Sequence, residues 1–143
     1  MQQNVIERKI MWGDLDALGI VYYPRYYEWI DACGHLFFEK INLNIGELWS
    51  ERKILFGLAE TSCRYLSPAR YHQSIRIITK IDALEEKTLI LKHSIHASTD
   101  DTLMVEGYEN RICLDVSDPK NFKAIDIPED IYTILESAKG GGA

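Results

Sequence analysis

The chain has 143 residues, enough for one domain with a hydrophobic core and too few for two. Its formal net charge of −6 and its lack of a basic stripe argue against nucleic acid as a partner. No apolar run approaches the length that crosses a bilayer, so no membrane partner is expected. The three cysteines have no C-x-x-C spacing and cannot all pair, which favours a reducing, cytoplasmic location.

The first part of the chain predicts one strand and one long helix. Residues 4–12 alternate β-branched and charged side chains, which is typical of a strand. Pro24 suits the first position of a helix because it has no N–H to leave unpaired, and apolar side chains then recur at helical spacing as far as Ile41. Gly34 lies mid-helix at a cost of about 1 kcal/mol relative to alanine, which predicts that another backbone crosses there closely.

The rest of the chain predicts a short helix, four strands and a final helix. Residues 44–47 have the form of a capping box and start the short helix. Four strand-like runs follow, and their short connections predict antiparallel pairing. A modest amphipathic helix begins at Pro128. We therefore predict a single domain over residues 1–139 and a flexible glycine-rich tail over residues 140–143.

These elements predict an α+β fold. A five-stranded antiparallel sheet cannot leave so apolar a helix in water, so the sheet is expected to wrap around the long central helix. A small sheet of this kind also has an outer face and an edge to cover, which predicts oligomerisation.

Two aspartates, Asp14 and Asp16, lie one residue apart just before the long helix. They open the motif Asp-x-Asp-Ala-x-Gly-x-Val-Tyr, which is followed by Tyr23, Pro24 and an aromatic-rich helix. Together with the later stretches YLSPARY, KTLILKHSIHA and KAIDIPEDI, in the same order, this motif resembles the hotdog-fold acyl-CoA thioesterases, and most nearly the 4-hydroxybenzoyl-CoA thioesterase group. Related thioesterases of the Tol–Pal cluster type usually have histidine at the position of Tyr23.

The resemblance covers nearly the whole chain and has several implications. It implies a hotdog fold and an enzyme that hydrolyses an aromatic acyl-CoA, such as 4-hydroxybenzoyl-CoA, or a short-chain acyl-CoA. It also implies a homodimer that assembles into a homotetramer, with each site built between paired subunits. Coenzyme A enters as part of the substrate, and no metal or redox cofactor is implied.

The residues themselves supply a mechanism for such a reaction. When a thioester is attacked, negative charge builds on its carbonyl oxygen, and the unpaired N–H groups at a helix N-terminus suit that oxygen. Pro24 has no N–H, so the backbone N–H of Tyr23 is the predicted donor, and the resemblance assigns the same position. Asp16 lies too far before the helix for a simple cap and is predicted to act as a nucleophile or as a general base on water. Asp14 is predicted to brace the loop by bonding to nearby amides.

Other residues are predicted to contact the substrate. Gly19 and Val21 lie between the two predicted catalytic residues and are assigned to substrate binding. Two interpretations of Asp31 stay open: an i,i+4 partner of His35, or an acceptor for an aryl hydroxyl at the far end of the pocket, across a subunit boundary. Phe56 falls where the second strand should approach the site, and the related group often has a small polar residue there, so this departure would reshape the acyl pocket.

One turn departs from the pattern of the related group. There, the turn before the fourth strand carries basic residues that help to hold the nucleotide phosphates, whereas residues 85–87 here read Glu-Glu-Lys. The positive charge must then come from other basic side chains or from a neighbouring subunit, or the nucleotide lies largely in solvent. The candidate coenzyme A-binding residues are Arg64, Arg70, Lys87 and Lys92.

Other chemistries fit the sequence poorly. His93 and His96 are three apart on a predicted strand and face opposite sides, so they cannot form a metal pair, and no metal site is predicted. A hotdog dehydratase would pair a carboxylate with a histidine in the pocket, and no histidine stands near the Asp16 motif. A non-catalytic acyl-CoA binder is the remaining alternative; such a sensor should lack the acid or carry an added DNA-binding segment, and neither applies.

Overall fold

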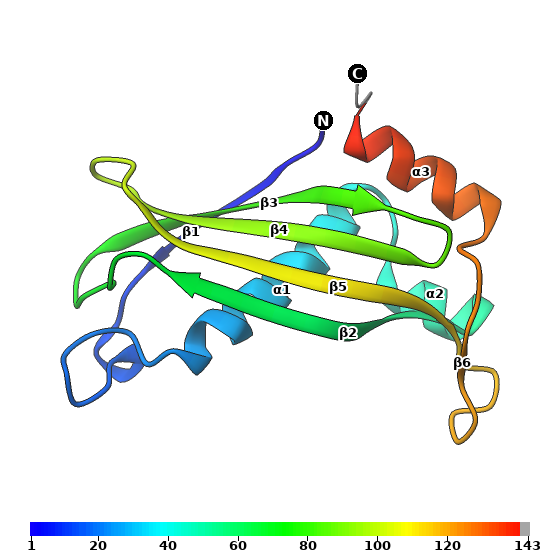
Figure 1. The fold of residues 1–143 in the computed structure, drawn as a ribbon, viewed down its shortest axis with the longest axis horizontal. Helices are drawn as coiled ribbons and strands as arrows, with labels where there is room; N and C mark the ends of the chain where they lie inside the picture. The colour runs from blue at the N-terminus through cyan, green and yellow to red at the C-terminus, as the bar shows by residue number, and fades with distance from the viewer. Residues whose placement is uncertain (141–143) are drawn as a thin grey trace.

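A curled antiparallel sheet covers one long helix in the computed structural model, which describes residues 1–140 (Figure 1). The sheet has the strand order β1-β3-β4-β5-β2, and β6 pairs with the end of β5. The elements in chain order are β1 (Asn4–Lys9), a 3-10 turn η1 (Trp12–Asp14), α1 (Pro24–Lys40), α2 (Ile45–Arg52), β2 (Ile54–Tyr65), β3 (Ser74–Leu84), β4 (Thr88–Ala97), β5 (Leu103–Asp115), β6 (Lys123–Ala124) and α3 (Glu129–Lys139).

The predicted α+β architecture is confirmed, with two differences in the strands. The sheet has six strands rather than five, because the two-residue β6 pairs Ala124 with Leu114 of β5, and a strand so short has no periodicity to recognise. The first strand ends at Lys9 instead of continuing to residue 12, because η1 turns the chain toward α1.

Helix α1 runs diagonally across the inner face of the sheet (Figure 1). Pro24 occupies its first position, as predicted, and the side chains that face the sheet are buried, with Ile30, Phe37 and Phe38 at most 1% exposed. The short helix α2 begins at the predicted cap, where the Asn44 side chain accepts the Glu47 N–H at 3.0 Å. The apolar stripe of α1 therefore forms the centre of the core.

Gly34 is explained by a side chain and not by a crossing backbone, so that prediction is wrong. A Cβ atom at this position would lie 2.7 Å from Oε1 of Glu109 on β5. Real Cβ atoms essentially never approach so closely, so any larger residue would displace the carboxylate. The glycine lets α1 pass directly over a buried acid.

The two edges of the sheet differ in length. β1 is a six-residue edge strand, whereas β2 has twelve residues and, within residues 1–140, no strand on its outer side. From Leu58 to Tyr65, β2 is exposed except at the half-buried Cys63. A long, unpaired, exposed strand is a template for pairing with another chain.

The chain ends lie close together, since the Gln2 N–H donates to the Ala138 carbonyl at 2.8 Å (Figure 1). Of the predicted tail, Gly140 is the residue that caps α3, with φ of 83°, and residues 141–143 lie outside the described residues. Over residues 1–140, no helix is both long and apolar enough to cross a membrane.

Candidate active site

The loop between η1 and α1 is built around Asp14. This side chain is 6% exposed, and its Oδ2 accepts the Met11 N–H at 2.9 Å. Nη2 of Arg8 lies 3.4 Å from Oδ1 of Asp14, and the Tyr22 N–H donates to the backbone carbonyl of Asp14 at 2.8 Å. The prediction that Asp14 braces the loop by bonding to nearby amides is confirmed.

Asp16 lies in a tight turn that this loop supports. The Gly19 N–H donates to the Asp16 carbonyl at 3.0 Å, and Gly19 has φ of 77°, a conformation that favours glycine. The Leu18 N–H donates to Asp16 Oδ1 at 2.8 Å, which fixes the carboxylate in an Asx turn. Oδ2 of Asp16 accepts no hydrogen bond within residues 1–140, so one oxygen is held and the other is available.

The Tyr23 amide is the open donor at the start of α1. The neighbouring amides are all paired. The Val21 N–H donates to the Ala69 carbonyl at 2.9 Å and the Tyr22 N–H to the Asp14 carbonyl at 2.8 Å. The Arg25 N–H donates to the Tyr22 carbonyl at 2.9 Å. No acceptor for the Tyr23 N–H exists among the described residues. Because the next residue is proline, this amide alone points unpaired out of the helix N-terminus.

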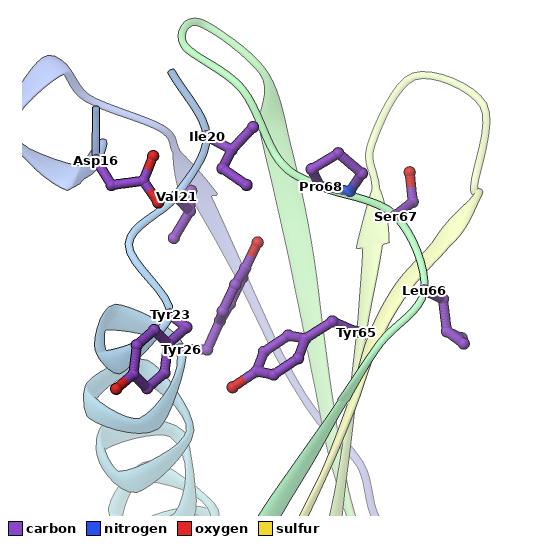
Figure 2. A pocket seen from close by; sticks show the side chains of 9 residues that line it. All are labelled: Asp16, Ile20, Val21, Tyr23, Tyr26, Tyr65, Leu66, Ser67 and Pro68. Atoms are coloured by element: carbon purple, nitrogen blue, oxygen red, sulfur yellow. The ribbon is translucent and has the colours of Figure 1, made fainter. Parts of the chain in front are cut away.

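Asp16 and Tyr23 both line one cavity of about 530 Å³ (Figure 2). Its lining combines the loop and the first turn of α1 with the segment that leaves β2. The lining residues are Asp16, Ile20, Val21, Tyr23, Tyr26, Tyr65, Leu66, Ser67 and Pro68. Of the predicted site residues, Asp16, Val21 and Tyr23 therefore share one cavity, whereas Gly19 shapes the turn beside it.

The β2 end of this cavity was missed by the sequence analysis. Tyr65 to Pro68 lie in the stretch YLSPARY, which carried part of the resemblance but received no role. In Figure 2 the Tyr26 and Tyr65 rings extend into the space between α1 and β2, and their centroids are 5.7 Å apart. The tyrosine-rich stretch that contains Tyr26 suits a flat aromatic acyl group, and plain core packing is its alternative interpretation; Tyr65 is the aromatic residue that the sequence did not point to.

The hydroxyls of Tyr26 and Tyr65 are neutral donors. Burial raises the pKa of Tyr26, against a backbone hydrogen bond with Ala69 that lowers it. Burial also raises the pKa of Tyr65, and a hydrogen bond with the Tyr27 hydroxyl adds to the shift. Both side chains therefore stay protonated at neutral pH and can orient a ligand without adding charge.

The three thiols are poor nucleophiles in this structure. Burial raises the pKa of Cys33 to about 11, helped by the negative charge of Glu109, and burial raises the pKa of Cys113 to about 11. Burial likewise raises the pKa of Cys63, although hydrogen bonds with Tyr27 and Tyr65 oppose the shift. Since the thiolate is the reactive form, none of the three cysteines is activated as a nucleophile.

Asp31 lies outside this cavity and has a partner that the sequence analysis did not predict. Its side chain is 52% exposed, and its Oδ1 lies 3.6 Å from His35 Nε2, the expected i,i+4 pair. The same oxygen accepts Arg111 Nη2 from β5 at 2.9 Å, and Nη2 also donates to Glu109 Oε2 at 2.6 Å. Both β5 residues face inward, where the sequence pattern gives no sign of an ion pair.

Phe56 also lies outside the cavity that contains Asp16. Its ring stacks on Phe38 with 5.4 Å between centroids. With His35 and Arg111 it lines a separate, smaller cavity of about 160 Å³ between α1, α2 and β2.

The four candidate coenzyme A-binding residues are dispersed. Arg70 is exposed next to the cavity, where its backbone bridges to Ile20, and Arg64 is exposed beside Tyr65 on β2. Lys87 lies in the β3–β4 turn, at the opposite end of the sheet from the start of α1, and pairs with Asp126 at 2.7 Å (Figure 1). Lys92 lies over the Tyr108 ring, 5.8 Å from its centroid.

The histidines of β4 serve separate structural contacts. His93 is fully buried and bonds to Thr79 and Glu109, whereas His96 is partly exposed, with its Nδ1 3.2 Å from the Asp101 carbonyl oxygen. In the part of the chain that is described, no three His, Cys, Asp or Glu side chains are grouped as a metal would need.

Residues 10–135 match the family model described as the thioesterase-like superfamily. The chain belongs to this superfamily. One relative, the 4-hydroxybenzoyl-CoA thioesterase of Pseudomonas sp. (strain CBS-3), is 29% identical over 133 residues, which cover 87% of this chain and 92% of the relative. The solved structure of that enzyme matches with a TM-score of 0.84 and 28% identity, covering 95% of this chain and all of that one.

Two further solved structures support the same assignment. An aspartate-to-asparagine mutant of 4-hydroxybenzoyl-CoA thioesterase in complex with 4-hydroxybenzoyl-CoA has a TM-score of 0.86 and 25% identity, and covers 95% of this chain and 100% of that chain. A gentisyl-coenzyme A thioesterase has a TM-score of 0.76 and 29% identity, and covers 90% of this chain and 98% of that chain. The predicted hotdog-fold thioesterase is confirmed.

Proposed function

We propose that the chain hydrolyses an acyl-CoA whose acyl group is a hydroxylated aromatic ring. The relatives that share 25–29% identity act on 4-hydroxybenzoyl-CoA and gentisyl-CoA. The proposal rests on one cavity that is lined by both Asp16, which has an oxygen free of hydrogen bonds, and Tyr23, whose backbone N–H is unpaired among residues 1–140. Its tyrosine-rich lining suits a flat aromatic group.

In this mechanism the thioester carbonyl lies between the two groups. The Tyr23 N–H donates to the carbonyl oxygen and stabilises the negative charge that develops there. In one route Asp16 Oδ2 attacks the carbonyl carbon, the coenzyme A thiolate leaves, and water then hydrolyses the mixed anhydride. In the other route Asp16 takes a proton from a water molecule that attacks the same carbon. Both routes give the free acid and coenzyme A, and neither draws on a metal or redox cofactor.

A second copy of the chain completes the proposed site. If two copies pair through β2 about a two-fold axis perpendicular to the sheet, their β2 strands run antiparallel. The Tyr65 end of one β2 then lies opposite the Phe56 end of the other. Arg111 binds both the Phe56 carbonyl, at 3.1 Å, and Asp31, so Asp31 lies close to that end of β2. Asp31 of the partner subunit would thus face the aryl end of a substrate whose carbonyl lies at Asp16.

A panel of acyl-CoAs tests the substrate class through free thiol release. We expect kcat/KM for 4-hydroxybenzoyl-CoA to exceed that for benzoyl-CoA by about tenfold or more, because a hydrogen bond to a charged acceptor is worth that much. Asp31→Asn should remove most of this preference and leave benzoyl-CoA turnover within a few-fold. Binding of the panel without thiol release would favour the acyl-CoA sensor, and equal turnover of both aryl substrates would remove Asp31 from its role.

The dimer has its own test in sedimentation equilibrium. Leu58 on β2 and Val5 on β1 are both 48% exposed and lie on opposite edge strands, so they form a matched pair. We expect a dimer or a multiple of it, with Leu58→Lys shifting the mass toward the monomer and Val5→Lys leaving it unchanged. A monomeric wild type at high concentration, or dissociation by Val5→Lys alone, contradicts this arrangement.

The proposal also covers the coenzyme A contacts, the assembly of the subunits and the location of the protein. Arg64 and Arg70 lie nearest the cavity and are the proposed contacts for the coenzyme A phosphates. Two such dimers are proposed to form a homotetramer. The proposed location is the cytoplasm, because the three cysteines are unpaired. No histidine lines the cavity among the described residues, so nothing favours a dehydratase.

A further inference from the structure

A chain of buried polar side chains runs from the interior of the sheet toward α1. Thr79 Oγ1 and His93 Nδ1 are hydrogen-bonded at 2.8 Å, and His93 Nε2 bonds to Glu109 Oε1 at 2.8 Å. Glu109 Oε2 accepts Arg111 Nη2 at 2.6 Å. Thr79, His93 and Glu109 are at most 1% exposed, and Arg111 is 6% exposed. Buried charges of this kind persist only when each is paired.

The helix is shaped to admit this network. The absence of a side chain at Gly34 leaves room for the Glu109 carboxylate, which would lie 2.7 Å from a Cβ there. Glycine in a helix interior is destabilising by about 1 kcal/mol, so the carboxylate is retained against a local cost. None of these four strand residues lines the cavity that contains Asp16, and the mechanism above does not use them.

The network reaches the surface at Asp31, whose Oδ1 also lies 3.6 Å from Nε2 of the exposed His35. The Arg111 guanidinium is fixed from three sides, because Nη1 donates to the Phe56 carbonyl at 3.1 Å while Nη2 donates to Glu109 and to Asp31 Oδ1. Oδ2 of Asp31 accepts no hydrogen bond within residues 1–140. The carboxylate, whose side chain is 52% exposed, is therefore held by one oxygen while the other is free of hydrogen bonds.

We propose that Arg111 is a positioning residue that orients Asp31 as the acceptor for the substrate hydroxyl. This rests on the proposed function, in which Asp31 of the partner subunit meets the aryl end of the substrate. An aspartate on an open helix face samples several rotamers, and holding it in one removes that entropic cost from binding. Two carboxylates share one guanidinium here, so the open oxygen favours a group that donates a proton, such as a neutral hydroxyl.

A double-mutant cycle tests whether Arg111 acts through Asp31. The quantity measured is the ratio of kcat/KM for 4-hydroxybenzoyl-CoA to kcat/KM for benzoyl-CoA, because losses common to both substrates cancel in it. Arg111→Lys keeps the charge but loses the Nη1 donor to the Phe56 carbonyl, which fixes the Nη2 that binds both carboxylates, so we expect the ratio to fall about tenfold. In an Asp31→Asn background the same change should leave the ratio unaltered.

Arg52→Lys is the matched control for Arg111→Lys. Arg52 forms a two-point pair with Asp130, at 2.6 and 3.0 Å, on the surface between α2 and α3, and Arg52→Lys should not change the ratio. If Arg111 had a purely structural role, Arg111→Lys would lower kcat/KM equally for both substrates, or would lower the ratio by the same factor in the Asp31→Asn background. Either result would overturn the proposal. A wild type with no hydroxyl preference would overturn the proposed function as well, before any variant is made.

One measurement needs no variant and applies even if Arg111→Lys does not fold. A crystal structure of the unliganded wild type should show the Asp31 carboxylate in a single conformer against Arg111. A carboxylate turned away from Arg111, or spread over several conformers, would contradict a positioning role.

Discussion

Asp16→Asn is expected to lower kcat for acyl-CoA hydrolysis by about a thousandfold, while the Kd for the substrate stays within a few-fold. The amide can still accept the Leu18 N–H that holds position 16, at 2.8 Å in the wild type, so the turn should persist. What is lost is the charged oxygen that attacks the carbonyl or activates water, a contribution of about 10²–10⁴ in rate. Single-turnover thiol release and equilibrium binding of the same acyl-CoA separate the two effects.

A second variant distinguishes the carboxylate from the loop that carries it. Asp82 is an exposed aspartate on the outer side of β3, so Asp82→Asn removes the same charge far from the cavity and should leave kcat unchanged. If Asp16→Asn retained both the wild-type kcat and the wild-type Kd, Asp16 would have no role in the reaction. If instead kcat were unchanged and only binding were lost, Asp16 would be a substrate contact and not a catalytic group.

Glu109→Ala is expected to lower the free energy of unfolding by about 3–5 kcal/mol, because it removes the fully buried carboxylate that pairs with Arg111 and leaves this cation the exposed Asp31 as its charged partner. The same change removes the acceptor for His93 Nε2, which is fully buried and has no route to water. Urea unfolding followed by circular dichroism measures the loss, with the m-value as a check that the native state stays compact.

Glu106→Ala is the matched control on the same strand. Glu106 lies three residues before Glu109 on β5, on the opposite face of the sheet, and is only half-buried. It belongs to none of the ion pairs of the described residues, so its removal should cost less than about 1 kcal/mol. Equal losses for the two variants would mean that the buried network contributes nothing beyond an ordinary acid on β5.

Much of the fold could be predicted because the strongest local signals agree with the final packing. Pro24 fixes the start of α1, the apolar spacing that follows marks its buried face, and the Asn44 cap starts α2. The Asp16 turn and the unpaired Tyr23 amide were also predictable, since both depend on residues within one short segment. Local geometry is what a single sequence reports best.

The missed features depend on contacts between distant segments. Tyr65 meets Tyr26 only after β2 has been placed on the sheet, so no spacing in the sequence pairs them. Glu109 and Arg111 are charged residues at inward positions of a strand, where the alternation rule expects apolar side chains, and their partners come from α1 and β4. For the same reason, Gly34 could be noted as unusual but not explained before Glu109 was seen beside it.

The central claim is that one thioester carbonyl is shared by the acid on the approach loop and the bare amide of α1. A crystal structure of the Asp16→Asn variant with bound 4-hydroxybenzoyl-CoA tests it most directly. We expect the carbonyl oxygen about 3 Å from the Tyr23 nitrogen, with the side chain at position 16 about 3–3.5 Å from the carbonyl carbon. A thioester bound with its carbonyl away from the Tyr23 amide, or in the separate cavity beside Phe56, would contradict it.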